Sequence, residues 1–399
     1  MQRNDTTGAR TARNHITVVG GGFAGLTAAI TAAESGAAVT LHEAHHTLGG
    51  RARTADGPYR TNEGPHALYR KGPHWTWLAQ RGLIGPLAQI PPLEAARFRF
   101  HLDGRLRRIP PLGFLRHALR TADQAPVDTD FLTWATRIAG PEAARQAAAF
   151  SGVALFHHDP GALSARFVQE RLHRSAALPP EAQYIQGGWG RLVERMAAYA
   201  REAGVRIETS SRLDALPLDD GPVVVATSLA AAARLLGEPA LGGESGRTVL
   251  FDLALRRRTG DPFIVSDLDA PGWIERFTAQ DPFLAPAGEQ LIQAQFPIAP
   301  GESKADGVAH AERLLDLGFP GWRERTVWRR EAVSGGRTGA VDRPGTTWRD
   351  RPAIDRGDGV YLVGDEVAAP GVLSEVSFTS AVEAVSLALR TRTLDLKSA

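Results

Sequence analysis

Three glycines near the start of the chain, Gly20, Gly22 and Gly25, follow directly after a run of mainly β-branched apolar residues, 15–19. In this spacing the first glycine permits a tight turn between a strand and a helix. The second lets the backbone approach a diphosphate, and the third lets the helix pack against the strand. Because glycine-rich turns are common, the spacing indicates a phosphate site only when a strand, a helix and a ribose-binding acid surround it.

The sequence around the glycines supplies these elements. The Ala-rich stretch 23–35 has the spacing of large residues typical of an amphipathic helix, whose first N–H groups would face the phosphates. A second strand over 37–42 is predicted to end at Glu43, which would accept hydrogen bonds from the adenosine ribose and disfavour a 2′-phosphate. We therefore expect a dinucleotide with an unphosphorylated adenosine ribose. The residues expected to contact it are Gly20, Gly22, Phe23, Ala24, Gly25, Glu43 and Ala44.

The stretch EAHHTLGGRART, 43–54, favours FAD over NAD. It resembles the motif after the second strand in the flavin amine oxidase superfamily, which includes protoporphyrinogen oxidases, phytoene desaturase-like enzymes and monoamine oxidases. The resemblance implies that Gly49, Gly50 and Arg51 wrap the pyrophosphate and ribityl chain of FAD. A guanidinium beside a diphosphate is also physically favourable. The alternative is a solvated basic loop without a ligand.

The stretch TNEGPHALYR, 61–70, resembles the family segment that lies beneath the isoalloxazine ring. By that resemblance Gly64 and Pro65 bring backbone close to the ring, and His66 faces the flavin or the substrate. His66 is the candidate catalytic residue. An equally open interpretation is a loop histidine with a structural hydrogen bond.

Two later stretches extend the resemblance. In 184–216 the family has a Gly-Gly turn, a helix, a strand and a residue whose backbone pairs with adenine, which would be Leu213. In DGVYLVGDEVAAPGVLSEVSFTSAVEAV the family places Gly364 and Asp365 beside the ribityl chain. The following helix would point its first N–H groups at the flavin C2 carbonyl, and Val376 is the expected start of that helix. Its register stays open, because Val376-Ser377 and Ser380-Ala381 replace the usual Gly-Ala and Ser-Gly pairs.

The fold class expected from these motifs is α/β, with a Rossmann-like FAD-binding domain interleaved with an α+β substrate domain. We expect a disordered tail over 1–13 and FAD-binding segments over 14–84, 184–228 and 350–399. The substrate domain would comprise a hairpin and helices over 85–183 and a sheet with a helix over 229–349.

Composition excludes several other classes of protein. The 399 residues are 43% hydrophobic and carry a formal net charge of +2, without a run of like charges typical of a nucleic-acid site. The absence of cysteine excludes disulfides, a Cys zinc site, a redox dithiol and a flavin tethered through sulfur. No apolar stretch approaches the length of a membrane span, and the polar first residues lack a secretory h-region. A cytoplasmic protein without a metal site is therefore expected.

The resemblance implies an FAD-dependent oxidoreductase, an oxidase or a desaturase, that dehydrogenates a small organic substrate by hydride transfer to flavin N5. Amine oxidases place a lysine near N5, but Lys71, Lys304 and Lys397 do not stand where that lysine is expected. This favours a desaturase-like dehydrogenase or an oxidase with an unusual oxygen site. The electron acceptor, dioxygen or another, stays open, as do the oligomeric state and the substrate.

Three alternatives remain. A flavin can act without net redox change, as in UDP-galactopyranose mutase. An NAD(P)H-dependent flavin monooxygenase is a second possibility, although its usual Gly-Asp-Ala motif is replaced here by Gly364-Asp365-Glu366. The third is a degenerate fold kept as a binding or scaffold subunit.

Overall fold

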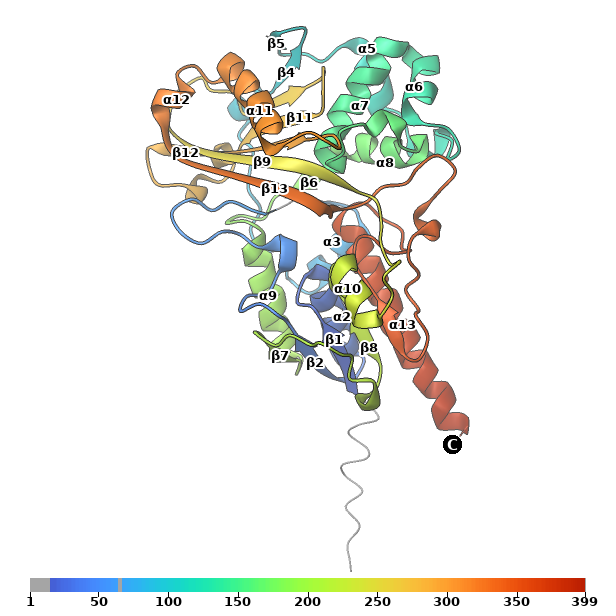
Figure 1. Cartoon of the computed structure of the whole chain (residues 1–399). Coiled ribbons are helices and arrows are strands. Elements are labelled where there is room, and N and C mark those ends of the chain that lie inside the picture. Colours follow the sequence, from blue (N-terminus) through green and yellow to red (C-terminus); the bar gives the residue numbers. More distant parts are fainter. Residues whose placement is uncertain (1–14, 64–66, 399) are drawn as a thin grey trace, which may run out of the picture.

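The structure is a computed structural model that describes residues 15–63 and 67–398. The predicted tail, 1–13, and three of the predicted site residues, Gly64, Pro65 and His66, lie outside the described residues. The described residues form two large sheets, and Figure 1 shows them one above the other.

A five-stranded parallel sheet forms the lower part of the molecule in Figure 1, with the strand order β14-β8-β1-β2-β7. The central strands are short and mostly buried, as expected for parallel strands that are covered on both faces. The strands are β1 (His15–Val19), β2 (Ala38–His42), β7 (Arg206–Glu208), β8 (Val223–Val225) and β14 (Val360–Leu362).

Helices from separate parts of the chain cover this sheet. Helix α2 (Phe23–Glu34) packs against β1 and β2, and both α9 (Trp189–Glu202) and α13 (Ser374–Ser398) pack against α2. The small alanines of α2 allow these close approaches, and all but one of its residues from 24 to 32 are buried. Helix α3 (Pro73–Gln80) packs on α13, and α10 (Leu229–Leu236) follows β8.

A seven-stranded mixed sheet forms the upper part, with the order β13-β9-β12-β11-β10-β4-β5. Only β4 and β10 pair in parallel within it. In β9, Val249, Phe251 and Leu253 point into the core beneath α11, whereas Asp252 points to the opposite face. The strands are β4 (Arg99–Leu102), β5 (Arg105–Arg107), β9 (Ser245–Arg256), β10 (Ile264–Asp267), β11 (Gly272–Arg276), β12 (Glu289–Pro297) and β13 (Thr326–Ala340).

Helices lie on both faces of this upper sheet. Helix α11 (Lys304–Gly318), with α12 (Trp322–Arg325) after it, covers one face, and a helical cluster packs on the other around Trp273. The cluster comprises α5 (Leu112–Ala118), α6 (Phe131–Ala139), α7 (Pro141–Leu155) and α8 (Ala165–Ser175). A short helix α4 (Pro92–Ala95) and a small sheet of β3 (Leu68–Tyr69) and β6 (Ala182–Gln183) complete the fold.

The predicted fold class is confirmed: a parallel Rossmann-like sheet is combined with a mixed sheet and helices. The hairpin expected within 85–183 is present: β4 and β5 pair antiparallel around Asp103 and Gly104. Both turn residues have positive φ, 52° and 70°, as a two-residue hairpin turn of this kind requires.

Candidate functional site

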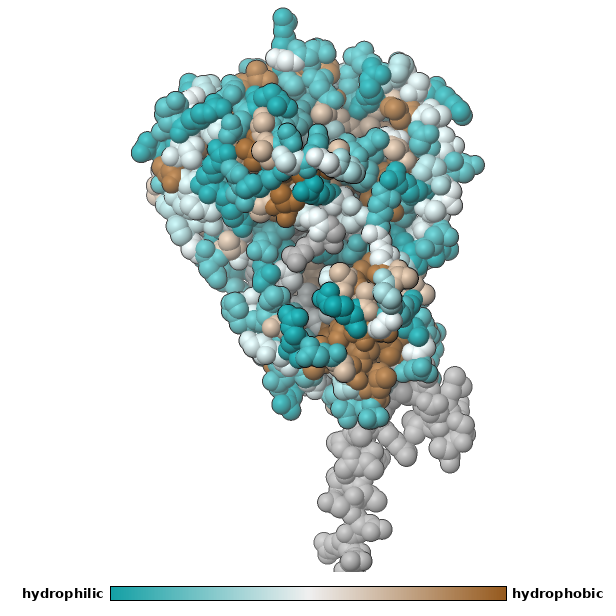
Figure 2. Space-filling model, in the orientation of Figure 1, coloured by the Kyte–Doolittle hydropathy of each residue, from teal (hydrophilic) through white to brown (hydrophobic). Residues whose placement is uncertain are grey.

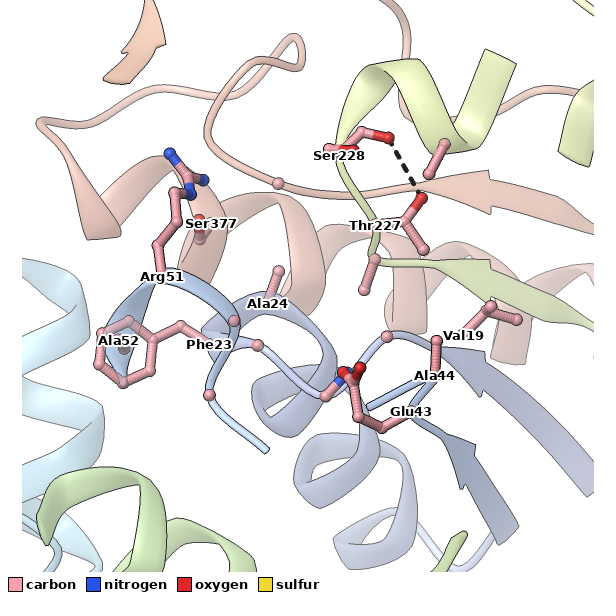
Figure 3. A pocket seen from close by; sticks show the side chains of 18 of the residues that line it. Val19, Phe23, Ala24, Glu43, Ala44, Arg51, Ala52, Thr227, Ser228 and Ser377 are labelled. Carbon is pink, nitrogen blue, oxygen red and sulfur yellow. Dashed lines mark hydrogen bonds between the residues drawn. The ribbon is translucent and has the colours of Figure 1, made fainter. Parts of the chain in front are cut away.

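A cavity of about 710 Å³ opens at the carboxyl ends of the parallel strands, where ligands bind in open α/β sheets. Figure 3 shows Arg51 and Ser377 on one side of it and Glu43 and Ala44 on the other. Most of the residues predicted to bind the cofactor line this one cavity. They are Gly20, Gly22, Phe23, Ala24, Glu43, Ala44, Gly49, Gly50, Arg51, Leu213, Gly364 and Asp365.

The three glycines of the first loop have separate structural roles. Gly20 has a φ of +109°, and a Cβ there would lie 2.5 Å from the Ala226 carbonyl oxygen. A Cβ on Gly25 would lie 1.8 Å from the Gly20 carbonyl oxygen, so Gly25 packs the helix on the loop and does not line the cavity. A Cβ on Gly22 would have only the Gly49 carbonyl oxygen nearby, at 3.9 Å. Gly22 therefore leaves open the path that a phosphate would take to the backbone.

Glu43 is buried at the end of β2 and is held by two backbone groups. Its Oε2 accepts a hydrogen bond from the Gly21 N–H at 2.8 Å, and its Oε1 accepts one from the His45 N–H at 2.9 Å. Each carboxylate oxygen keeps a further lone pair for another donor, such as a ribose hydroxyl. The geometry suits the role that the sequence predicts for this acid.

The Gly49-Gly50-Arg51 turn connects the first glycine loop to the cavity wall that contains Asp365. Gly49 and Gly50 have φ values of +110° and +55°, and the Gly49 N–H donates to the Gly21 carbonyl at 2.8 Å. Arg51 donates from Nη2 to Asp365 Oδ1 at 2.5 Å. Burial acts to lower the pKa of Arg51, but the Asp365 carboxylate outweighs it and raises that pKa. The guanidinium is thus held as a cation at the cavity wall.

Glu366 is a cavity residue to which the sequence assigned no site role. Its side chain is buried next to Asp365, and it lines the same cavity. Burial raises the pKa of Glu366 to about 7, and Asp365 adds to that rise, while Arg51 and Arg351 oppose it. Its place directly after the Gly364-Asp365 pair is the signal that could have found it.

The cavity lining also includes Leu213, together with Ser211, Arg212, Arg234 and Leu235. These residues come from the loop after β7 and from α10, on either side of the strand end of β1. The structure therefore brings Leu213 to the cavity, and its pairing with adenine stays a prediction.

The prediction that the last helix starts at Val376 is wrong: α13 begins at Ser374. The Val376 N–H donates to the Leu373 carbonyl at 3.2 Å. The Val376 side chain lines a separate, smaller cavity next to α8. The reason is Glu375, whose Oε2 accepts the Val372 N–H at 3.0 Å and ties the turn before the helix to its first residues. Ser374 and Ser377 face the main cavity instead.

His74 packs against the first turn of α13. The His74 Nδ1 lies 3.2 Å from Ser374 Oγ, and its ring stacks on Phe378 with the centroids 5.4 Å apart. Burial lowers the pKa of His74 to about 3, so the ring is neutral at physiological pH. Sequence patterns gave no signal for this contact, because the two residues are 300 positions apart.

Outside the cavity, His101, Asp267 and Asp269 are the group of described residues close enough to share a cation. Asp267 accepts from His101 at 2.8 Å and from His310 at 2.7 Å. Burial would raise the pKa of Asp267, but these two histidines lower it to about 2. We therefore interpret the group as an ion-pair cluster that joins β4, β10 and α11.

Among the described helices, none has the length and apolar character needed to cross a bilayer.

Residues 18–81 match the family model of the NAD(P)-binding Rossmann-like domain. A search of curated proteins found no match to the sequence. Among solved structures, an oxidoreductase from Methanosarcina mazei aligns with a TM-score of 0.74 at 17% identity, over 93% of this chain and 100% of that one. Cyclohexylamine oxidase from Brevibacterium oxydans aligns with a TM-score of 0.68 at 15% identity, over 94% of this chain and 99% of that one. Reduced UDP-galactopyranose mutase aligns with a TM-score of 0.67 at 13% identity, over 95% of this chain and 96% of that one. The expected resemblance is thus confirmed for the fold, whose neighbours include amine oxidases and other oxidoreductases.

Proposed function

We propose that the protein is an FAD-dependent oxidoreductase that dehydrogenates a small organic substrate. The observation that carries the proposal is the meeting of two separate motifs at one cavity. The Gly49-Gly50-Arg51 turn and the Gly364-Asp365 pair lie together there with the first glycine loop. A site for a mononucleotide after β1 would need only the glycine loop and Glu43. The Gly49-Gly50-Arg51 turn and the Gly364-Asp365 pair extend the site from there toward the upper sheet.

The residues present fit FAD. The open space over Gly22 admits a diphosphate beside the first N–H groups of α2, and Arg51 supplies a cation. Glu43 would hold the adenosine ribose, and Asp365 would accept from a ribityl hydroxyl. The residues Ser374 and Ser377, at the start of α13, would face the flavin end. Bound in this way, FAD would accept a hydride from a substrate C–H bond at its N5 atom.

The protein's own contribution would be binding, orientation and the exclusion of water. The partial positive charge at the start of α13 would stabilise negative charge near the flavin C2 carbonyl. The start of α13 is fixed by Glu375 and His74, so this dipole is set before ligand binds. Lys71 and Lys304 do not line the cavity, and each pairs with a carboxylate elsewhere. The absence of these lysines from the site favours a dehydrogenase over an amine oxidase of the usual kind.

Anaerobic photometry tests the function once flavin is bound. A panel of amines, amino acids and unsaturated carbon skeletons is added without oxygen, and loss of the flavin absorbance identifies a substrate that is oxidised. If reduced protein instead isomerises a nucleotide sugar with no acceptor consumed, the mutase alternative is correct. If NAD(P)H alone bleaches the flavin rapidly, the monooxygenase alternative is correct.

A further inference from the structure

One end of the molecule carries long aliphatic side chains that stand in solvent. Ile109, Leu112 and Leu119 are 75%, 77% and 77% exposed. They lie on the loop after β5 and along α5, at the end opposite the five-stranded sheet (Figure 1). Leu112 and Leu119 are two helical turns apart and share one face, while Phe114 and Ala118 on the other face are buried. The outer face of α5 therefore exposes two leucines with Arg116 between them, while its inner face packs in the core.

The same part of the chain is strongly basic. Residues 97–120 contain seven arginines and a single carboxylate, Asp103, whereas the whole chain has a formal net charge of only +2. Arg105, Arg108 and Arg116 are exposed, and within 15–63 and 67–398 none of the three has a carboxylate in ion-pair range. Asp103 is taken by Arg107 at 3.2 Å. Cations therefore outnumber anions on this surface.

Two arginines of the hairpin, Arg105 and Arg107, lie on the same side of the upper sheet as the aliphatic residues of α5. Arg107 lies opposite Phe100 in the β4–β5 ladder, so the two side chains point to the same face. The Phe100 ring is 6.3 Å from the Phe114 ring of α5. Arg105 alternates in phase with Arg107 along β5 and points to that face as well. Figure 2 shows single apolar residues among hydrophilic ones at this end.

We propose that this α5 surface, made of Arg105, Ile109, Leu112, Arg116 and Leu119, docks the protein on an anionic lipid bilayer. Separate protruding aliphatic groups beside cations suit the fluid headgroup–acyl boundary of a bilayer, which needs no shaped partner surface. Each arginine near acidic headgroups would strengthen partitioning by about fivefold. A nucleic acid would use the arginines but leave the aliphatic groups in water. A symmetric dimer through this surface would bring like charges together.

Cosedimentation of the full-length protein with lipid vesicles tests the proposal. One set of vesicles is phosphatidylcholine alone, and the other contains about one-third phosphatidylglycerol. We expect binding to the anionic vesicles that weakens with salt, and little binding to the neutral ones. The variant Arg105→Gln/Arg116→Gln should bind about twenty-five-fold more weakly. The variant Leu112→Ser/Leu119→Ser should bind about tenfold more weakly.

A matched control, Leu218→Ser/Arg201→Gln, changes exposed residues beside the five-stranded sheet and should bind as the wild type does. Absence of binding to anionic vesicles, or equal binding by all variants, overturns the proposal. A dimer in light scattering that the leucine variant dissociates would assign the surface to a second copy of the chain. Binding to duplex DNA that depends on the arginines and not on the leucines would assign it to a nucleic acid.

Discussion

The Arg51 guanidinium lies 2.5 Å from Asp365 Oδ1, although the two residues are 314 positions apart in the sequence. Arg51 comes from the turn after β2, and Asp365 comes from the loop after β14 at the far edge of the same sheet. This ion pair joins the opposite ends of the chain across the cavity wall. It also sets the charge that a diphosphate would meet there.

Replacing Arg51 by alanine should weaken FAD binding without unfolding the protein. A charge-assisted contact to a phosphate contributes about 1.5–3 kcal/mol, so the dissociation constant should rise about tenfold to a hundredfold. Titration of the apoprotein with FAD, followed by quenching of flavin fluorescence, measures this. The control is Arg323→Ala, which removes an exposed arginine paired with Asp316 outside the cavity. An unchanged affinity in Arg51→Ala would remove this residue from the site.

The glycines of the first loop should separate binding from folding. Gly22→Ala adds a methyl group into open space and should leave the free energy of unfolding of the apoprotein within about 0.5 kcal/mol, while FAD affinity falls sharply. Gly25→Ala places a methyl group 1.8 Å from a carbonyl oxygen and should destabilise the apoprotein by about 2–3 kcal/mol. Urea unfolding of the two apoproteins distinguishes them. Equal destabilisation by both would contradict the assigned roles.

Glu366 should make FAD binding depend on pH. Its pKa is about 7 in the protein, raised mainly by burial. A bound diphosphate would place more negative charge in the same cavity, so FAD should bind best while Glu366 keeps its proton. Affinity should then be highest below pH 7 and fall by up to about tenfold per pH unit above it. FAD titrations at pH 6, 7 and 8 measure this, and Glu366→Gln should remove most of the dependence. The same slope in both proteins would exclude Glu366 as its source.

The Arg174–Glu375 pair should hold the start of α13 in place. Arg174 Nη1 donates to both carboxylate oxygens of Glu375, at 2.7 and 2.9 Å. Because Glu375 is buried, removing the cation leaves a buried carboxylate without its partner, at a cost of about 3 kcal/mol. Arg174→Ala should therefore lower the free energy of unfolding by that amount, as urea denaturation would show. The double variant with Glu375→Gln should lose much less than the sum of the two single variants. Simple additivity would mean that the pair is not coupled.

Much of the lower sheet could be predicted from the sequence, because its signals are local. The β-branched run, the glycine spacing and Glu43 lie within a single βαβ unit, and β1, α2 and β2 form where expected. The turn of the hairpin is likewise signalled by two adjacent residues, Asp103 and Gly104. The domain bounds remain predictions.

The rest of the site depends on contacts between distant residues. The start of α13 is set by Glu375 through Arg174, which lies 201 positions earlier, and no helical periodicity records such a contact. The same holds for His74 behind Ser374. The sequence pattern does not predict the α5 surface, because its arginines are interleaved with apolar residues and form no run of like charge. Periodicity places residues on an element, but only the fold shows which elements meet.

The central claim is that the protein binds FAD. The decisive measurement is the visible absorbance spectrum of the purified protein, repeated on the supernatant after acid precipitation. We predict a yellow protein with two absorbance bands whose chromophore moves to the supernatant, as FAD held without a covalent bond would. A colourless protein that also fails to take up added FAD would contradict the central claim, and the cavity at Gly20, Gly49 and Asp365 would need another ligand.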